Sequence, residues 1–211
     1  MELGLLILAG GRSLRMGRDK PGIPFPDPGD PPLIHRVATA IGGLAGPPLI
    51  AGPSDYGTGW QVVPDEQGIE GPVSGLLAGL EALQTSLVLV LGADAPFPSV
   101  RLARGLYRIA GREPQAEAVV PEREGRLEPL FAIYRAGASH GLREMARQLG
   151  QPGRGPSLRQ TLPGLRLRTV AEPEWRVWDP SGISFLNCNT PEQLAVAAAM
   201  ARAQPDRGGN Q

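Results

Sequence analysis

The chain has few of the residues that most often build nucleophilic or zinc sites. Its 211 residues include one cysteine, Cys188, and two histidines, His35 and His140. A single cysteine excludes an internal disulfide and a zinc site made of cysteines, and it is typical of a reducing compartment. No partner motif accompanies either histidine, so we expect both to pack or to cap a helix. These scarcities predict a cytoplasmic protein whose chemistry does not depend on cysteine or histidine.

The chain also lacks a net charge and a long apolar segment. Its 21 basic and 21 acidic residues cancel, which argues against a broad nucleic-acid or membrane surface. The opening MELGLLILAGG is apolar, but it has no basic start and is too short to span a bilayer. We expect neither a nucleic-acid partner nor a membrane partner, and any anion binding must be local.

Lysine is the scarcest basic residue, because Lys20 is the only one among the 21 lysines and arginines. It ends the glycine-rich stretch LAGGRSLRMGRDK, residues 8–20. Gly10 and Gly11 let a base or ribose approach the main chain closely, and Arg12, Arg15, Arg18 and Lys20 supply positive charge. The stretch matches neither the P-loop nor the dinucleotide-binding fingerprint. It is a solvated basic turn or a phosphate-binding loop, and the lone lysine favours the second, because a compact ammonium suits a phosphate.

The chain does contain 29 glycines and 23 prolines, and apolar runs alternate between them with helical patterns. This pattern predicts an α/β fold, a mostly parallel Rossmann-like sheet with helices on both faces. We expect one domain over residues 1–203 and a disordered tail over 204–211. The expected strands are 4–10, 47–52, 60–65, 86–94, 117–121, 127–134, 165–170 and 183–189. The expected helices are 32–44, 71–84, 99–110, 138–149 and 190–203.

Asp94 ends a buried strand in the sequence GADAPF. In parallel sheets ligands bind beyond the carboxyl ends of strands, so Asp94 and the loop after Gly10 are candidates for one site. A turn-forming aspartate ahead of Pro96 is the structural alternative. The functional interpretation is a magnesium ligand, since magnesium is usually held by one or two carboxylates together with substrate phosphates. A phosphate monoester is itself a nucleophile, so catalysis would need only positioning and charge neutralisation by Asp94, Lys20 and Arg15.

Several other residues allow two interpretations. We expect Cys188 to be a small buried hydrophobe, and Trp175 and Trp178 to pack against the sheet. Asn187 and Asn189 alternate across one residue, so both would face one side of the expected strand 183–189, and at least one is favoured for the site. Glu128 is either a solvated strand position or a substrate contact.

The stretch 8–20 resembles the signature of the molybdenum cofactor guanylyltransferases, and further motifs extend the resemblance along almost the whole chain. These motifs are VVPDE (62–66), GPVSGL (71–76), GADAPF (92–97), LEPLFAIY (127–134) and LNCNTPEQL (186–194). The resemblance implies a nucleotide-diphospho-sugar transferase fold that transfers GMP from GTP to molybdopterin, or to its molybdenum-loaded form, with release of pyrophosphate. It also implies Mg²⁺ as cofactor, and other cofactor-biosynthesis proteins and molybdoenzyme chaperones as partners.

The resemblance implies a role for each matching residue. In the first half, Leu8, Ala9 and Gly10 would contact the guanosine portion, Lys20 the phosphates, Asp65 the nucleotide, and Asp94 both GTP and magnesium. Gly11 and Gly71 are also expected among the binding residues. In the second half, LEPLFAIY and residues Asn187 and Asn189 would face the pterin and close the site.

Two departures leave alternatives open. Family members often carry asparagine where this chain has Ala51, which makes base selectivity less secure than the transfer chemistry. Gly71, Pro72 and Gly75 nevertheless favour the guanylyl branch over the cytidylyl branch. Family members also tend to carry an arginine pair or an Arg-Ser pair in the loop after the central helix, whereas here Pro156 precedes Ser157 and the nearby arginines are Arg154 and Arg159. Which of these arginines, if any, reaches the pterin phosphate stays open. A cytidylyltransferase, a sugar-1-phosphate transferase and a non-enzymatic carrier of nucleotide and cofactor are the alternative functions.

Overall fold

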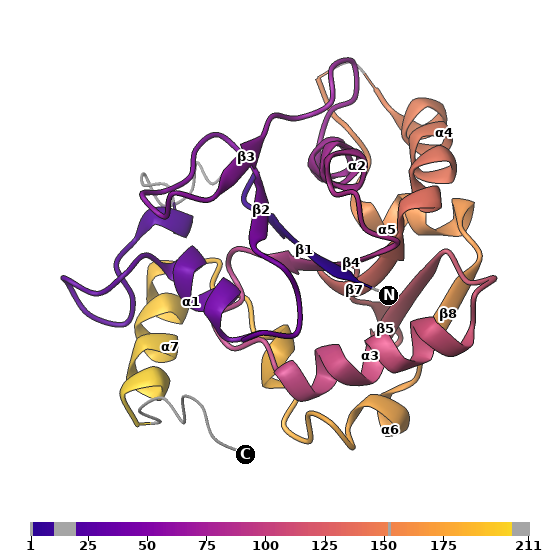
Figure 1. Cartoon of the computed structure of the whole chain (residues 1–211). Coiled ribbons are helices and arrows are strands. Elements are labelled where there is room, and N and C mark those ends of the chain that lie inside the picture. The colour runs from indigo at the N-terminus through magenta and orange to yellow at the C-terminus, as the bar shows by residue number, and fades with distance from the viewer. Residues whose placement is uncertain (1, 11–19, 152, 204–211) are drawn as a thin grey trace.

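The centre of the computed structural model, which describes residues 2–10, 20–151 and 153–203, is one mixed β-sheet (Figure 1). In this part of the chain the strand order is β3-β2-β1-β4-β7-β5-β6, and β8 pairs with β5. The strands are β1 (Leu3–Leu8), β2 (Pro48–Ala51), β3 (Gln61–Val63), β4 (Leu87–Gly92), β5 (Ala118–Arg123), β6 (Arg126–Leu127), β7 (Phe131–Arg135) and β8 (Leu167–Val170).

Helices cover both faces of the sheet, which confirms the α/β fold expected from the sequence. The helices are α1 (Leu33–Thr39), α2 (Pro72–Ala82), α3 (Val100–Arg112), α4 (Ser139–Leu149), α5 (Leu158–Thr161), α6 (Glu172–Trp175) and α7 (Pro191–Ala203). Residues of β1 alternate between the two layers: Leu5 and Ile7 pack with α1, α3 and α6, whereas Leu6 and Leu8 pack with α2, α4 and α5. Both faces of β1 are therefore buried, which explains its uninterrupted apolar sequence.

The sheet contains strands of both directions. β3, β2, β1 and β4 are parallel to their neighbours, and β5 is parallel to β8. β7 lies antiparallel between β4 and β5. Because β7 is reversed, its first residue, Phe131, lies beside Leu91 near the end of β4. The turn before β7 thus reaches the same edge of the sheet as the carboxyl ends of β1 and β4.

The helix boundaries follow local signals that the sequence analysis identified. Ser99 caps α3, its Oγ accepting a hydrogen bond from the backbone N–H of Leu102 at 3.3 Å. Pro72 occupies the first turn of α2. At the start of α7 the side-chain Oε1 of Gln193 accepts from the backbone N–H of Thr190, and the backbone N–H of Gln193 donates to Thr190 Oγ1, so the predicted capping box is present.

One expected strand is wrong, and two further expected elements are shorter than predicted. Residues 183–189 form no strand: a short 3₁₀-helix, η4 (Ile183–Phe185), is followed by irregular chain, because the Cys188 N–H donates to Asp94 O instead of to a neighbouring strand. The expected strand 127–134 is broken by a turn in which the Phe131 N–H donates to Glu128 O. The expected helix 32–44 ends at Thr39, because Gly42 and Gly43 have positive φ angles of 32° and 64°.

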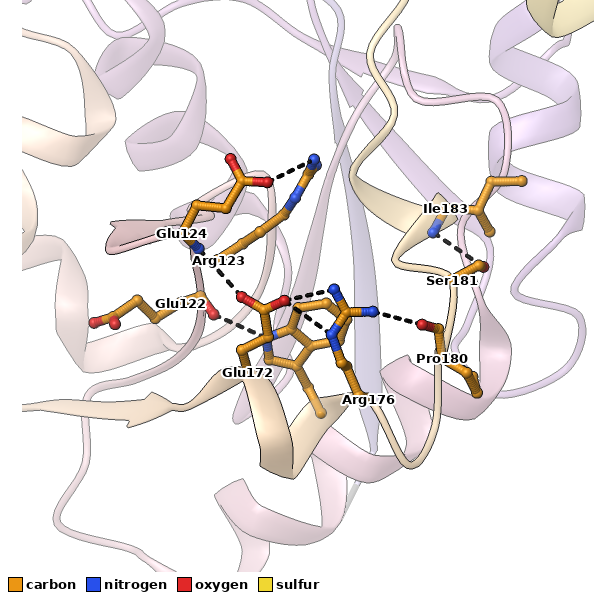
Figure 2. Close-up of polar contacts among 9 residues, drawn as sticks. Glu122, Arg123, Glu124, Glu172, Arg176, Pro180, Ser181 and Ile183 are labelled. Atoms are coloured by element: carbon orange, nitrogen blue, oxygen red, sulfur yellow. Dashed lines mark hydrogen bonds and ion pairs between the residues drawn. The ribbon is translucent and has the colours of Figure 1, made fainter.

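Trp175 fixes α6 to the sheet, as its predicted packing role requires. The ring is fully buried, and its Nε1 donates to Glu122 O at 2.8 Å. Around it, the Glu172 carboxylate accepts from Arg176 at 2.8 Å and from the Glu124 N–H at 3.3 Å (Figure 2). Trp178 lies over Gly105 of α3 and is partly buried against the same core. Both tryptophans are therefore structural.

A small third core joins segments from the two ends of the described chain. It contains Phe25, Leu33, Cys188, Ala197, Ala198 and Ala201. Arg202 of α7 pairs with the Asp27 carboxylate at 2.7 Å beside this core. α7 therefore packs on the segment that follows Lys20. Residues 204–211, expected to be a disordered tail, lie outside the described part of the chain.

No helix in the described part of the chain is both long enough and apolar enough to cross a membrane.

Candidate nucleotide site

The carboxyl ends of β1 and β4 form one wall of the candidate site. Leu8 pairs with Gly92 in the sheet, and the Ala93 N–H donates to Leu8 O at 3.1 Å. On the other side of β1, the Ala9 N–H donates to Ala51 O at 2.8 Å. These bonds bring Leu8, Ala9 and Gly10 beside the segment that carries Asp94. Two predicted site segments far apart in the sequence thus meet at one sheet edge.

Asp94 follows β4, and both the segment around Cys188 and the end of β4 contact it. Its carbonyl oxygen accepts from the Cys188 N–H at 2.9 Å. A Cβ at Gly92 would lie 2.9 Å from Asp94 Oδ1, so a side chain there would require the carboxylate to move. Burial raises the pKa of Asp94, and the positive charge of Lys20 partly offsets that rise. The carboxylate is therefore partly desolvated and close enough to Lys20 to sense its charge.

Lys20 begins a short 3₁₀-helix, η1 (Lys20–Gly22). Its side chain reaches residues 188 and 189, just before α7. Its Nζ donates to Cys188 O at 3.1 Å and to Asn189 Oδ1 at 3.4 Å. Cys188 is fully buried, and burial followed by the charge of Asp94 raises the pKa of its thiol to about 11. The thiol is therefore neutral and structural, as predicted. The peptide of Cys188 binds both Lys20 and Asp94.

The two predicted asparagines do not share a strand face, because no strand forms there. Asn189 contacts Lys20, whereas Asn187 is half-buried just before Cys188. Both lie in the segment that crosses the Asp94 end of β4. Two further predicted residues, Gly11 and Arg15, lie outside the described part of the chain.

A cavity of about 640 Å³ opens beside this wall. It is lined by Leu8, Gly10, Ala51, Asp65, Ile69, Glu70, Gly71, Pro72, Gly75, Gly153, Arg154 and Gly155. Partial burial raises the pKa of the Asp65 carboxyl. Predicted residues Leu8, Gly10, Asp65 and Gly71 thus share this cavity, whereas Lys20 and Asp94 are not among its described lining residues.

Two glycines keep the cavity open. A Cβ at Gly75 would lie 3.2 Å from the Ala51 Cβ and 3.2 Å from Asp65 Oδ1. Gly71 has a φ of +84°, a conformation that side-chain-bearing residues rarely adopt, and it lies against the Pro156 carbonyl oxygen. The glycines of the GPVSG motif therefore serve the cavity and the turn that enters α2.

The far wall of the cavity comes from residues 153–155, a loop in which only Arg154 was a candidate site residue, for the pterin phosphate. Gly155 packs on the backbone of Glu70 and Gly71, where a Cβ would overlap the Glu70 carbonyl oxygen. The Gly153 N–H donates to Glu70 Oε1 at 3.2 Å. Glycines on both sides of Arg154 were the available signal, but the sequence does not reveal which backbone they approach.

Replacing Gly155 by alanine should destabilise the protein by about 1–3 kcal/mol, because the added Cβ would overlap backbone atoms of Glu70 and Gly71, which cannot rotate away as a side chain can. Urea denaturation would measure the loss. The matched control is Gly137→Ala, where a Cβ meets nothing within 4 Å. Equal stability of Gly155→Ala and the control would show that residues 153–155 do not pack on Glu70.

Glu128 and Arg159 form a separate charged pair at the start of the turn before β7. Arg159 Nη2 donates to Glu128 Oε2 at 3.1 Å, and Arg159 Nε donates to Leu127 O at 2.6 Å. Burial raises the pKa of Glu128, and Arg159 opposes that rise. Arg159 is therefore occupied on β6, whereas Arg154 faces the cavity. The structure separates the two arginines that the sequence left as alternatives.

The sheet with one reversed strand, and a site at the carboxyl ends of β1 and β4, define a fold of the nucleotide-diphospho-sugar transferase type. Residues 5–173 match the MobA-like NTP transferase domain. The chain belongs to this family, which is a family of nucleotidyltransferases.

Relatives and solved structures agree with this assignment. A molybdenum cofactor guanylyltransferase of Desulfosudis oleivorans is 32% identical, over 94% of this chain and 95% of the relative. A probable one of Chloroflexus aggregans is 30% identical over 94% and 95%. The fold is similar to that of molybdopterin-guanine dinucleotide biosynthesis protein A of Archaeoglobus fulgidus, with a TM-score of 0.76, 21% identity, and coverage of 95% and 99%. The 2-C-methyl-D-erythritol 4-phosphate cytidylyltransferase of Thermus thermophilus has a similar fold, with a TM-score of 0.62, 22% identity, and coverage of 96% of this chain and 100% of that one.

Proposed function

We propose that the protein transfers GMP from GTP to molybdopterin, or to its molybdenum-loaded form, and releases pyrophosphate in the cytoplasm. One observation carries the proposal: the Cys188 peptide binds both Lys20 and the Asp94 segment at the sheet edge beside the cavity. The Lys20 ammonium, which can bind phosphates, and the Asp94 carboxylate, which can bind a metal ion, thus lie next to a cavity that can hold a nucleoside. The names of the relatives support guanine and molybdopterin as substrates. We assign the activity to one domain, residues 1–203.

The residues at Asp94 fit a magnesium ion. The carboxylate is partly desolvated, and Lys20 offsets that cost only in part, so a cation would be stabilised there. No group of three or more histidine, cysteine, aspartate or glutamate residues in the described chain could enclose a metal. One carboxylate plus substrate phosphates is the usual arrangement for magnesium. Asp94 would hold the ion, which would neutralise charge on the phosphates of GTP.

The residues of the chain supply positioning and charge. An oxygen of the acceptor's phosphate monoester forms a bond to the α-phosphorus of GTP, and the bond from that phosphorus to the β-phosphate oxygen breaks. Lys20 Nζ, already oriented by Cys188 O and Asn189 Oδ1, donates to the phosphate oxygens. The reaction needs no protein nucleophile and no redox partner, in keeping with the neutral thiol of Cys188.

The acceptor would lie on the β7 side of Asp94. The reversed strand brings Leu130 to the end of β4, where the Gly92 N–H donates to Leu130 O at 3.2 Å. Asn187 and Asn189 border the same edge, and both are candidates for contacts to the pterin. This arrangement supports an acceptor opposite the nucleoside cavity.

A pyrophosphate-release assay with molybdopterin, Mg²⁺ and each NTP in turn tests the proposal. We expect a signal with GTP alone. A signal with CTP alone would move the protein to a cytidylyl activity and overturn the guanine assignment. Nucleotide binding without pyrophosphate from any NTP would instead favour a carrier.

A further inference from the structure

Arg154 lies at the wall of the cavity, and its guanidinium, unlike those of nearby arginines, has no partner within the described chain. It lines the nucleotide cavity between Gly153 and Gly155, and Gly155 packs closely on the backbone of Glu70 and Gly71. Its N–H donates to Gln151 O at 2.9 Å, and its carbonyl accepts from the Gln151 N–H at 3.1 Å, so both backbone groups are engaged. Among the described residues, no hydrogen bond or ion pair involves its guanidinium. Arg143 and Arg159, by contrast, each bind a glutamate.

The cavity walls carry donors and acceptors at different places. The carboxylates of Asp65 and Glu70 are acceptors, although Glu70 Oε1 already receives the Gly153 N–H. Arg154 brings donors only. Ala51 contributes a methyl group and no polar atom. Since neither Lys20 nor Asp94 lines the described cavity, the cavity suits the base rather than the triphosphate.

This combination matches guanine better than the other bases. Guanine presents O6 and N7 as two adjacent acceptors, which an arginine fork binds in bidentate geometry. Its N1–H and N2–H₂ groups can donate hydrogen bonds to a carboxylate. Cytosine carries an N4–H₂ donor where guanine has O6, so an arginine there would face a donor.

We propose that Arg154 selects the base by donating to O6 and N7 of guanine. The inference rests on the proposed function and deepens it, since it names the residue that makes the nucleotide GTP. It also explains how a chain with Ala51 on the β2 side of the cavity can be selective, because the discriminating contact comes from the opposite wall. Arg159, paired with Glu128 on β6, is left to the acceptor side.

The test measures equilibrium binding of GTP and of 7-deaza-GTP, which lacks the N7 acceptor, by calorimetry in the presence of Mg²⁺. The wild-type protein should bind 7-deaza-GTP on the order of tenfold more weakly, because one bond of a bidentate pair is lost. Arg154→Met, which keeps an apolar stem without the guanidinium, should bind both nucleotides equally. Arg112→Met, a change at the exposed end of α3 outside the cavity, should retain the wild-type ratio.

The outcomes separate this inference from the proposed function. If Arg154→Met weakens all four NTPs alike and keeps the 7-deaza penalty, the arginine binds phosphate and the inference is wrong. If the wild-type protein shows no 7-deaza penalty but still guanylates molybdopterin, only the inference fails. If the wild-type protein binds no NTP, both fail. Loss of the penalty in Arg154→Met, together with pyrophosphate release from GTP by the wild-type protein, supports both.

Discussion

Replacing Asp94 by asparagine should reduce transfer by about 10²–10³-fold, the usual effect of removing one preorganised electrostatic contribution to the transition state. The amide keeps the shape but supplies no negative charge to a magnesium ion. The measurement is pyrophosphate release at saturating GTP. Glu144→Gln, at an exposed position of α4, is the matched control and should leave the rate unchanged. Wild-type activity in Asp94→Asn would remove Asp94 from the mechanism.

The same substitution should stabilise the fold at neutral pH. Burial raises the pKa of Asp94 in the folded state, so the protonated form favours folding. Its stabilising contribution is complete at pH values below the unfolded-state pKa and is lost as the pH rises through the folded-state pKa. Asparagine is uncharged throughout, so the melting temperature of Asp94→Asn should exceed that of the wild type at pH 7 and not at acidic pH. A lower melting temperature at pH 7 would contradict the desolvated environment.

Replacing Lys20 by methionine should also reduce transfer by about 10²-fold or more, because an oriented cation is lost beside the phosphates. Lys20→Arg should retain part of the rate, on the order of a tenth, because a planar fork cannot reproduce the ammonium's bonds to Cys188 O and Asn189 Oδ1. The exposed exchange Arg112→Lys is the control for the chemical change. Full activity in Lys20→Arg would show that charge alone matters.

The charge of Lys20 should affect the pH dependence of the reaction through the pKa of Asp94. Lys20 lowers the pKa of Asp94, so Lys20→Met should raise that pKa further above the ordinary range. If the ionised carboxylate is the active form, the acidic limb of the kcat/KM profile should move to higher pH in Lys20→Met. Lys20→Arg keeps the charge and should shift it less. An unchanged acidic limb in Lys20→Met would mean that another group controls it.

The sequence identifies elements where one local signal dominates. The apolar runs of β1 and β4 are buried on both faces, so their composition alone predicts them. Ser99 and Thr190 mark helix starts through bonds within a few residues. The shared edge of Leu8 and Asp94 follows from parallel strands, and this part of the site is predictable for the same reason.

The sequence fails where a distant backbone decides the structure. Residues 183–189 have an apolar strand-like composition, yet the Cys188 N–H bonds to Asp94 O across the site. The reversal of β7 depends on which strand it joins, and no local pattern encodes that choice. Arg154 reaches the cavity only because Gly155 packs on Glu70, a contact between loops far apart in the sequence. The part of the candidate site at the strand ends is therefore predictable from the sequence. The opposite wall, residues 153–155, is not.

The third core forms only when α7 docks, so the Lys20 side of the candidate site is completed late in synthesis. The Cys188 peptide that orients Lys20 belongs to the same small cluster as Ala197, Ala198 and Ala201 of α7. These residues emerge from the ribosome after every strand of the sheet. A nascent chain can therefore assemble its sheet and the cavity while Lys20 still lacks its hydrogen bond to Cys188 O. Competence for transfer would be the last property gained, at the moment α7 docks.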